Sequence, residues 1–300
     1  MRTVWATRAL LIASSIGGWG CAALDEEVLD PGPVGSVVLR HFDVGQADAT
    51  LVQAPDATIL IDAGHWERGD LVPYLLAARV AHIDLMILTH PHADHIGQVE
   101  EVLEAFPVSE VWTSGWQHDT ASFDRALDAV AVHDAALYEP RAGDIASWGD
   151  LHVEVVNPTL PLEDVHDNIA VRIVFRDFSA VYTGDAEAEH EAHMIDGGLE
   201  LDSTLLQLGH HGSRTSTSWD FLEAVDPEIA IYSAARNSPY GHPHREIVSR
   251  VDDLGIPLYG TAEHGTIVVT SNGTRYDVSL GRPLTHEPSS WLEWVPPSGS

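Results

Sequence analysis

The chain has 300 residues, of which 44% are apolar, so it is long enough and apolar enough to bury a sizeable core. It carries 46 acidic residues against 15 basic ones, all of them arginine, and its formal net charge is −31. This excess excludes the broad basic face of a protein that holds nucleic acid by general phosphate neutralisation, although it leaves a local phosphate site open.

The first 21 residues have the pattern of an export signal. Two arginines precede an apolar run over residues 9–20, which is too short to span a bilayer. Cys21, the only cysteine, then stands before an acidic stretch, as the lipid-modified cysteine of a lipoprotein does, although Gly18 replaces the usual aliphatic residue. A plain secretory peptide or a buried N-terminal segment is the alternative. We expect an exported chain, lipid-anchored at the cell surface or secreted, with residues 22–35 as an acidic linker.

From residue 36 onward, short β-branched runs alternate with helical patterns. The first half predicts strands at 37–42, 49–53, 58–61 and 83–88, and helices at 71–80, 98–106 and 122–132. The second half predicts strands at 151–156, 170–175, 180–182 and 204–208, a helix at 186–194, and further elements at 221–225, 229–233, 246–254, 257–259, 266–270 and 275–278. Both halves begin rich in strands, which favours an α+β fold over residues 36–280, with two packed β-sheets flanked by helices. Residues 281–300 are expected to form a loosely packed tail.

The strongest local signal is Thr89-His90-Pro91-His92-Ala93-Asp94-His95, which directly follows the predicted buried strand at 83–88. Three imidazoles and a carboxylate within six positions are costly to bury without partners, but metal ions can satisfy all four. His90 and His92 can point to one ion while Asp94 and His95 turn toward a second. The motif therefore predicts two divalent ions, with zinc expected over manganese.

This motif resembles the metal-binding signature of the metallo-β-lactamase fold, an αβ/βα four-layer sandwich. Other landmarks follow in the order that the fold requires. Leu60-Ile61-Asp62-Ala63-Gly64 resembles the segment whose acid, here Asp62, orients the histidine loop without binding metal. Tyr182-Thr183-Gly184-Asp185 resembles the strand end whose carboxylate bridges both ions, and Gly209-His210-His211-Gly212-Ser213 resembles the segment with the last histidine ligand.

Finer motifs are similar to the hydrolase domain of the ComEC/Rec2 competence proteins and their free-standing relatives, over residues 37–279. They are Phe42-Asp43-Val44-Gly45-Gln46, His-His-Gly-Ser followed by Thr215-Ser216, and Tyr240-Gly241-His242-Pro243-His244. One departure is Ala47-Asp48, where the family has Gly-Asp. The resemblance does not reach the multi-span channel region of those proteins, so it implies hydrolysis and not DNA uptake.

A second departure concerns the first ion. Many metallo-β-lactamase enzymes place a third histidine between the histidine loop and the bridging acid, where this chain reads His166-Asp167-Asn168. Either Asn168 or water completes the first site, or His166 supplies the missing imidazole.

The resemblance implies a dimetal-dependent hydrolase that acts through a metal-bridging hydroxide. The implied metal ligands are His90, His92, Asp94, His95, Asp185 and His211. Asp94 and Asp185 also belong to the expected catalytic set, together with His210 near the substrate and His242 as a proton donor or phosphate ligand.

Three further residues are candidates for substrate binding. Ser213 and Thr215 could donate hydroxyl hydrogen bonds, and Arg214, helped by Arg236, could hold a phosphate. The other histidines, among them His118 and His190, are expected to be solvated, and His244 is expected to cap a helix or shape a turn.

The expected reaction is hydrolysis of a phosphodiester bond in nucleic acid or a small phosphoester. The alternatives are hydrolysis of a lactam or lactone, and a non-catalytic surface lipoprotein that uses the fold as a metal-dependent binding module. The charge argues against a processive nuclease, but the same composition predicts adaptation to concentrated salt, where the screening length falls to about 3 Å at 1 M. No protein partner is inferred.

Overall fold

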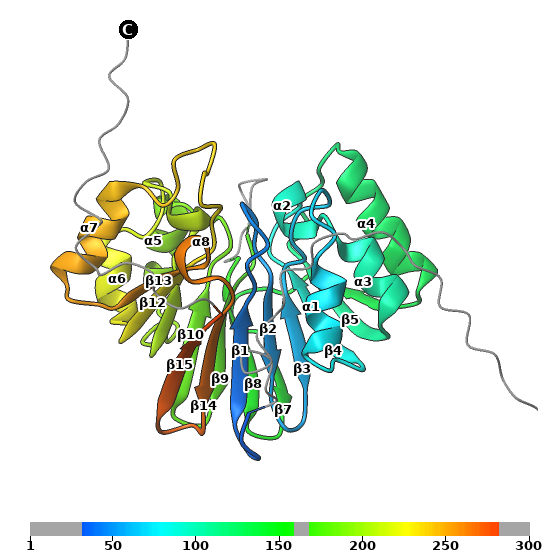
Figure 1. The fold of residues 1–300 in the computed structure, drawn as a ribbon, viewed down its shortest axis with the longest axis horizontal. Coiled ribbons are helices and arrows are strands. Elements are labelled where there is room, and N and C mark those ends of the chain that lie inside the picture. The colour runs from blue at the N-terminus through cyan, green and yellow to red at the C-terminus, as the bar shows by residue number, and fades with distance from the viewer. Residues whose placement is uncertain (1–31, 159–167, 282–300) are drawn as a thin grey trace, which may run out of the picture.

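The computed structural model describes residues 32–158 and 168–281. Across these residues two β-sheets face each other, and helices cover the outer face of each, so that four layers result (Figure 1). The predicted sandwich of two packed sheets is confirmed. The export signal with Cys21, most of the predicted linker, His166 and nearly all of the predicted tail lie outside the described residues.

The first sheet is antiparallel at one side and parallel at the other. Its strands lie in the order β15 (Tyr276–Leu280), β14 (Ile267–Ser271), β1 (Val37–His41), β2 (Thr50–Gln53), β3 (Thr58–Ile61), β4 (Ile83–Leu88), β5 (Val108–Thr113) and β6 (Ala136–Tyr138). Pairing is antiparallel from β15 to β3 and parallel from β3 to β6. The parallel strands therefore end at one edge of the sheet.

The second sheet repeats this plan. Its order is β13 (Leu258–Gly260), β12 (Ile229–Tyr232), β11 (Leu205–Gln207), β10 (Phe178–Tyr182), β9 (Ala170–Phe175), β8 (Leu151–Asn157) and β7 (Ile145–Trp148). Strands β7 to β10 pair antiparallel, and β10 to β13 pair parallel. The similar composition of the two halves of the sequence thus corresponds to two sheets of similar design.

Helices from each half of the chain cover the sheet of that half (Figure 1). The first set is α1 (Leu71–Ala77), α2 (Ala93–Ile96), α3 (Val99–Ala105) and α4 (Ala121–Val132), and the second is α5 (Ala188–Asp196), α6 (Trp219–Val225), α7 (Arg245–Asp253) and α8 (Thr261–His264). The side chains of Thr120 and Ser218 cap the first turns of α4 and α6, because each accepts a hydrogen bond from the backbone N three residues further along the chain. One apolar core lies between the sheets, and a second and a third lie under the two helical layers.

The sequence prediction differs from the structure in particular elements. Strands β5, β6 and β7 were not predicted, because β6 is exposed, β7 alternates exposed and partly buried residues, and only two residues of β5 are fully buried, so none has the continuous apolar run that marked β4. Helix α1 ends at Ala77, earlier than the predicted Val80, because Arg79 has a positive φ of 59°. The segment predicted as an irregular histidine loop contains the short helix α2, which begins after His92.

Candidate metal centre

The candidate metal centre lies where the two sheets bring together the ends of their strands. Asp62 follows β3, the histidine motif follows β4, Asp185 follows β10, and His211 follows β11. Loops at the carboxyl ends of parallel strands are the usual place for a site in such sheets, because the strands end there together. Segments that are distant in sequence, from both halves of the chain, therefore contribute to one cluster.

Asp62 holds the histidine motif in place. Its Oδ1 accepts a hydrogen bond from Thr89 N at 2.8 Å, and its Oδ2 accepts from Thr89 Oγ1 at 2.9 Å and from His95 Nδ1 at 2.8 Å. Because the His95 proton is on Nδ1, its Nε2 is free to bind a metal ion. Asp62 thus makes the contacts with the histidine motif that an orienting acid would make.

One candidate group of metal ligands consists of His90, His92 and Asp185. His90 Nε2 lies 2.9 Å from His92 Nδ1 and 3.6 Å from Asp185 Oδ2, so the three side chains face one point. Asn168 supports this group, since its Oδ1 accepts a hydrogen bond from the backbone N of Asp185 at 3.2 Å. Its amide oxygen therefore holds the backbone of Asp185.

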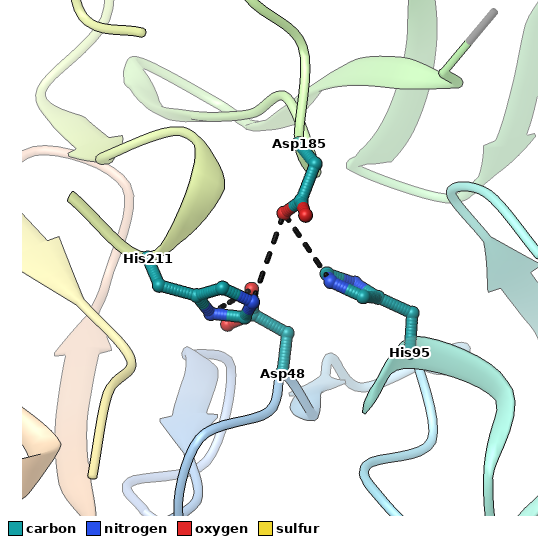
Figure 2. A group of neighbouring side chains, drawn as sticks. All are labelled: Asp48, His95, Asp185 and His211. Atoms are coloured by element: carbon teal, nitrogen blue, oxygen red, sulfur yellow. Dashed lines mark ion pairs between the residues drawn. The ribbon is translucent and has the colours of Figure 1, made fainter. Parts of the chain in front are cut away.

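The second candidate group contains Asp48, His95, Asp185 and His211, whose ligand atoms all lie within 4.8 Å of one another (Figure 2). Asp185 Oδ1 is 3.2 Å from His95 Nε2 and 3.8 Å from His211 Nε2, and Figure 2 shows the two rings on either side of that carboxylate. Asp94 lies beside this group, with its Oδ2 3.3 Å from His211 Nε2. Asp185 belongs to both groups, as a bridging carboxylate must.

Unsatisfied buried atoms show that these residues fit metal ions. His95 Nε2, Asp185 Oδ1 and His211 Nε2 are buried and have no hydrogen-bond partner among the described residues. Such atoms are rare in folded proteins, and here they face only the opposing side chains of the cluster, at 3.2–3.8 Å. Imidazole nitrogen and carboxylate oxygen are the donors that zinc and manganese accept, so a metal ion would satisfy all three atoms.

The cluster also shifts the pKa values of its members. Burial opposes the charge on His211, but Asp185 and Asp48 raise the pKa of this imidazole to about 9. The pKa of His95 is raised well above its ordinary value, since Asp185, Asp62 and Asp94 outweigh burial. The pKa of the Asp185 carboxyl is held well below its ordinary range by His95 and His211, again against burial. Without metal, the cluster is therefore held by charge pairs between imidazolium and carboxylate.

The backbone at the centre takes conformations that side chains rarely adopt. Asp62, His210 and His211 have φ values of 59°, 51° and 56°. For residues other than glycine this left-handed region is strained, and such strain concentrates at functional sites. Gly184, with φ +54°, precedes the bridging acid, and a Cβ there would lie 2.7 Å from the Thr89 side chain. The close approach of the loops after β4 and β10 thus requires glycine at this position.

His242 lies beside the centre, with its ring 6.1 Å from the ring of His211. Gln46 fixes its tautomer, because Gln46 Oε1 accepts from Ala235 N at 3.3 Å and so turns the amide Nε2 toward His242 Nδ1, also at 3.3 Å. Burial and the neighbouring His211 lower the pKa of His242 to about 4. His242 is therefore neutral near pH 7 and presents Nε2–H as a hydrogen-bond donor.

The other predicted substrate contacts lie on the loop after the 3₁₀ turn His210–Gly212. Thr215 Oγ1 is 3.2 Å from His210 Nδ1 and donates to Ser213 Oγ at 3.1 Å, so these hydroxyls also hold one another. Arg214 is exposed beside them, and its backbone N donates to His244 Nδ1 at 3.1 Å. His244 occupies the N-cap position of α7 but makes no capping hydrogen bond with its side chain, which instead accepts from the Arg214 backbone.

Three residues near the centre were not predicted from the sequence. Asp48 was noted only as a change in a turn, and Gln46 only as part of a motif, because both lie in the loop before β2 and reach the centre only in the folded chain. His118 was expected to be solvated, but this was wrong. Its ring is half-buried and lies 5.3 Å from the ring of His92, beside Trp116.

Comparison with known proteins agrees with this geometry. Residues 42–236 match the family model described as the metallo-beta-lactamase superfamily. The chain is 29% identical over 247 residues to ComE operon protein 3 of Bacillus subtilis, covering 75% of this chain and 32% of that protein. It is also 29% identical over 249 residues to Recombination protein 2 of Haemophilus influenzae, covering 80% and 30%. The chain thus spans about a third of the length of these relatives.

Solved structures share the fold at low identity. The metallo-beta-lactamase fold protein YhfI from Bacillus subtilis matches with a TM-score of 0.55 at 14% identity, over 78% of this chain and 100% of that one. A metallo hydrolase from the archaeon Ignicoccus hospitalis matches with a TM-score of 0.50 at 17% identity, over 78% and 98%.

Proposed function

Since the chain belongs to the metallo-beta-lactamase superfamily, we propose that it is a dimetal-dependent hydrolase of phosphodiester bonds, in nucleic acid or in a small phosphoester. The observation that carries the proposal is the pair of ligand groups that share Asp185. Two divalent ions, when bound, supply a nucleophile at neutral pH and offset the charge that develops on the phosphoryl oxygens.

The choice of a phosphodiester is supported by charge beside the centre. Arg214 and Arg236 are exposed on the two loops that also carry His211 and His242, and Arg245 is exposed at the start of α7, directly after the second of these loops. None of the three forms an ion pair with a described acidic residue, whereas six other arginines do. In a chain with a net charge of −31, cations left without acidic partners at the candidate site favour an anionic substrate.

His242 and His210 suit the binding of phosphoryl oxygens. The Gln46 contact leaves the proton of neutral His242 on Nε2, where it can donate to an oxygen of the substrate. His210 Nε2 lies 3.5 Å from Asp185 Oδ2 and its ring is partly exposed, so it lies between the centre and solvent. We assign both residues to substrate binding, and we assign Ser213 and Thr215 to holding the His210 loop as well as to the substrate.

The non-catalytic alternative has little support. A binding module derived from this fold would be expected to lack a ligand of the second ion. Asp94, His95, Asp185 and His211 are all present and lie together. The arrangement therefore favours turnover over simple metal-dependent binding.

The test is metal analysis of the purified chain with turnover of bis(p-nitrophenyl) phosphate and single-stranded DNA in molar salt, with added manganese or zinc. Asp185→Ala should lose both ions and all turnover, because Asp185 belongs to both groups. Asp252→Ala, an exposed acid on α7, is the matched control and should behave as the unmodified chain. Less than about one metal per chain together with no turnover would refute the enzyme proposal, and turnover by Asp185→Ala would refute the assigned site.

We also propose that the chain is exported and anchored through lipid on Cys21. The charge pattern of residues 1–21 supports the proposal. No helix among residues 32–158 and 168–281 is long and apolar enough to cross a membrane. Labelling of cells with a fatty-acid analogue should mark the unmodified chain and not Cys21→Ser, and equal labelling of the two would refute the anchor.

A further inference from the structure

Asp48 is a third buried aspartate at the metal centre that the proposed reaction has not used. It lies in the loop between β1 and β2, with 3% of its surface exposed. Its backbone N donates to Asp94 O at 3.1 Å, and its backbone O accepts from Gly64 N at 2.8 Å. The histidine motif and the segment after β3 thus hold the backbone of Asp48 between them.

Only one oxygen of the Asp48 carboxylate has a hydrogen-bond donor. Oδ1 accepts from Gln207 Nε2 at 2.7 Å, and Thr50 Oγ1 fixes that amide by donating to Gln207 Oε1 at 3.3 Å. Oδ2 lies 3.4 Å from His211 Nδ1, but this nitrogen gives its proton to Ser233 O at 3.0 Å. Oδ2 therefore has no hydrogen-bond donor among the described residues, although it belongs to the side chain grouped with His95, Asp185 and His211 (Figure 2).

The negative charge of the buried Asp48 carboxylate is not explained by its hydrogen bond with Gln207. Asparagine has the same shape and would accept the same hydrogen bond from Gln207 without burying a charge. A buried carboxylate beside Asp94 and Asp185 is unfavourable unless positive charge compensates it. Histidines bind metal as neutral imidazoles, so His95 and His211 cannot supply that charge once they act as ligands. A bound metal ion would supply the compensation.

We propose that Asp48 Oδ2 is a direct ligand of the second metal ion, together with Asp94, His95, Asp185 and His211. The inference rests on the proposed function, because it requires that the centre holds metal. It gives the second ion five protein ligands, against the three of the group formed by His90, His92 and Asp185. The two ions should therefore bind with unequal affinity, and the second ion should be the tighter one.

The first experiment is a titration of the full metal-free chain with Mn²⁺ or Zn²⁺ alone, by calorimetry and by competition with a chelator. Asp48→Asn, which keeps the Gln207 contact, should weaken the tighter ion more than about 100-fold, beyond the 10–100-fold loss typical of residues that only support a ligand. Gln207→Leu, which removes the anchor and keeps the carboxylate, should weaken it by no more than that 10–100-fold loss, and so less than Asp48→Asn does. Equal losses in the two variants, or unchanged binding in Asp48→Asn, would overturn the inference.

The second experiment detects the contact itself. In a chain carrying Cys21→Ser, which removes the only native thiol, Asp48→Cys should give a thiolate-to-metal charge-transfer absorption when Co²⁺ binds. Thr50→Cys in the same background is the matched control, since Thr50 is equally buried but contacts Gln207. Bound Co²⁺ without this absorption in Asp48→Cys, or with the same absorption in Thr50→Cys, would overturn the inference.

The two proposals fail in different ways. If the unmodified chain binds neither metal, the proposed function fails, and the assignment of Asp48 fails with it. If the unmodified chain binds two ions, Asp185→Ala loses both, and Asp48→Asn keeps both at native affinity, only the role of Asp48 is refuted.

Discussion

Replacing Asp62 by asparagine should damage both the stability of the fold and the binding of metal. The carboxylate accepts three hydrogen bonds, two from Thr89 and one from His95, and 2% of Asp62 is exposed. The asparagine amide oxygen can still serve Thr89 N, but its NH₂ group would face two donors, Thr89 Oγ1 and His95 Nδ1. His95 would then lose the contact that keeps Nε2 directed at the centre.

The magnitude follows from these contacts. Breaking a buried pair by removing one partner costs about 3–5 kcal/mol, and each unsatisfied buried donor costs about 1–3 kcal/mol. We therefore expect Asp62→Asn to lower the free energy of unfolding of the metal-free chain by about 3–5 kcal/mol. Loss of a residue that orients a metal ligand costs about 10–100-fold in metal affinity, so the second ion should weaken by that factor.

The assays are urea unfolding of the metal-free chain and metal titration. Asp84→Asn is the matched control, because Asp84 also accepts one backbone hydrogen bond, from Thr58 N at 2.8 Å, and also lies beside a histidine, His82, but on the surface. It should cost less than about 1 kcal/mol and leave metal affinity unchanged. If Asp62→Asn destabilises the chain no more than Asp84→Asn does, the orienting role of Asp62 is refuted.

Three further outcomes are expected. Asp185 and Asp48 outweigh burial and raise the His211 pKa to about 9, so the His211 proton stabilises the metal-free fold fully below about pH 6.5, and this stabilisation is lost toward pH 9. Urea titrations should show the free energy of unfolding falling between these pH values, and calorimetry should show metal affinity rising. A flat pH profile would contradict the pairing of His211 with these two carboxylates. Gln46→Leu removes the group that fixes the His242 tautomer, so turnover of bis(p-nitrophenyl) phosphate should fall about 10–100-fold while the metal content stays the same. Unchanged turnover would argue against His242 as a hydrogen-bond donor to the substrate. Tyr182→Phe leaves buried His41 Nε2 without its hydrogen-bond partner at 3.1 Å, so denaturant titration should show the free energy of unfolding lowered by about 1–3 kcal/mol. A decrease below about 0.5 kcal/mol would show that this contact is not needed for stability.

Much of the metal centre could be predicted from sequence because its residues lie in compact motifs at the ends of strands. The run from His90 to His95 directly follows β4, and Asp62 and Asp185 directly follow β3 and β10. The family and the enzyme class predicted from these motifs are confirmed by the match over residues 42–236. The expectation of zinc over manganese, the adaptation to concentrated salt and the lipid on Cys21 stay predictions.

Other features could not be predicted because their partners are distant in sequence. Gln207 and Asp48 are 159 positions apart, and Gln46 and His242 are 196 positions apart, yet each pair is in hydrogen-bond contact. His118 lies on a polar stretch that reads as solvated, and only the packing of its loop against Trp116 and His92 removes part of it from water. Strand periodicity predicts which elements form, but it does not determine which loops meet.

The sequence by itself determined the α+β class, the order of the main strands, and the residue types gathered at their ends, since apolar periodicity and ligand spacing are local properties. Only the tertiary structure decided that Asp185 serves two groups, that Asp48 joins one of them, and that Asn168 accepts a hydrogen bond from the backbone N of Asp185. These features depend on the packing of one sheet against the other. This packing brings the carboxyl ends of β4 and β10 so close that Thr89 leaves no room for a side chain at position 184, which is glycine. Packing of this kind is set by the whole core between the sheets and not by any single motif.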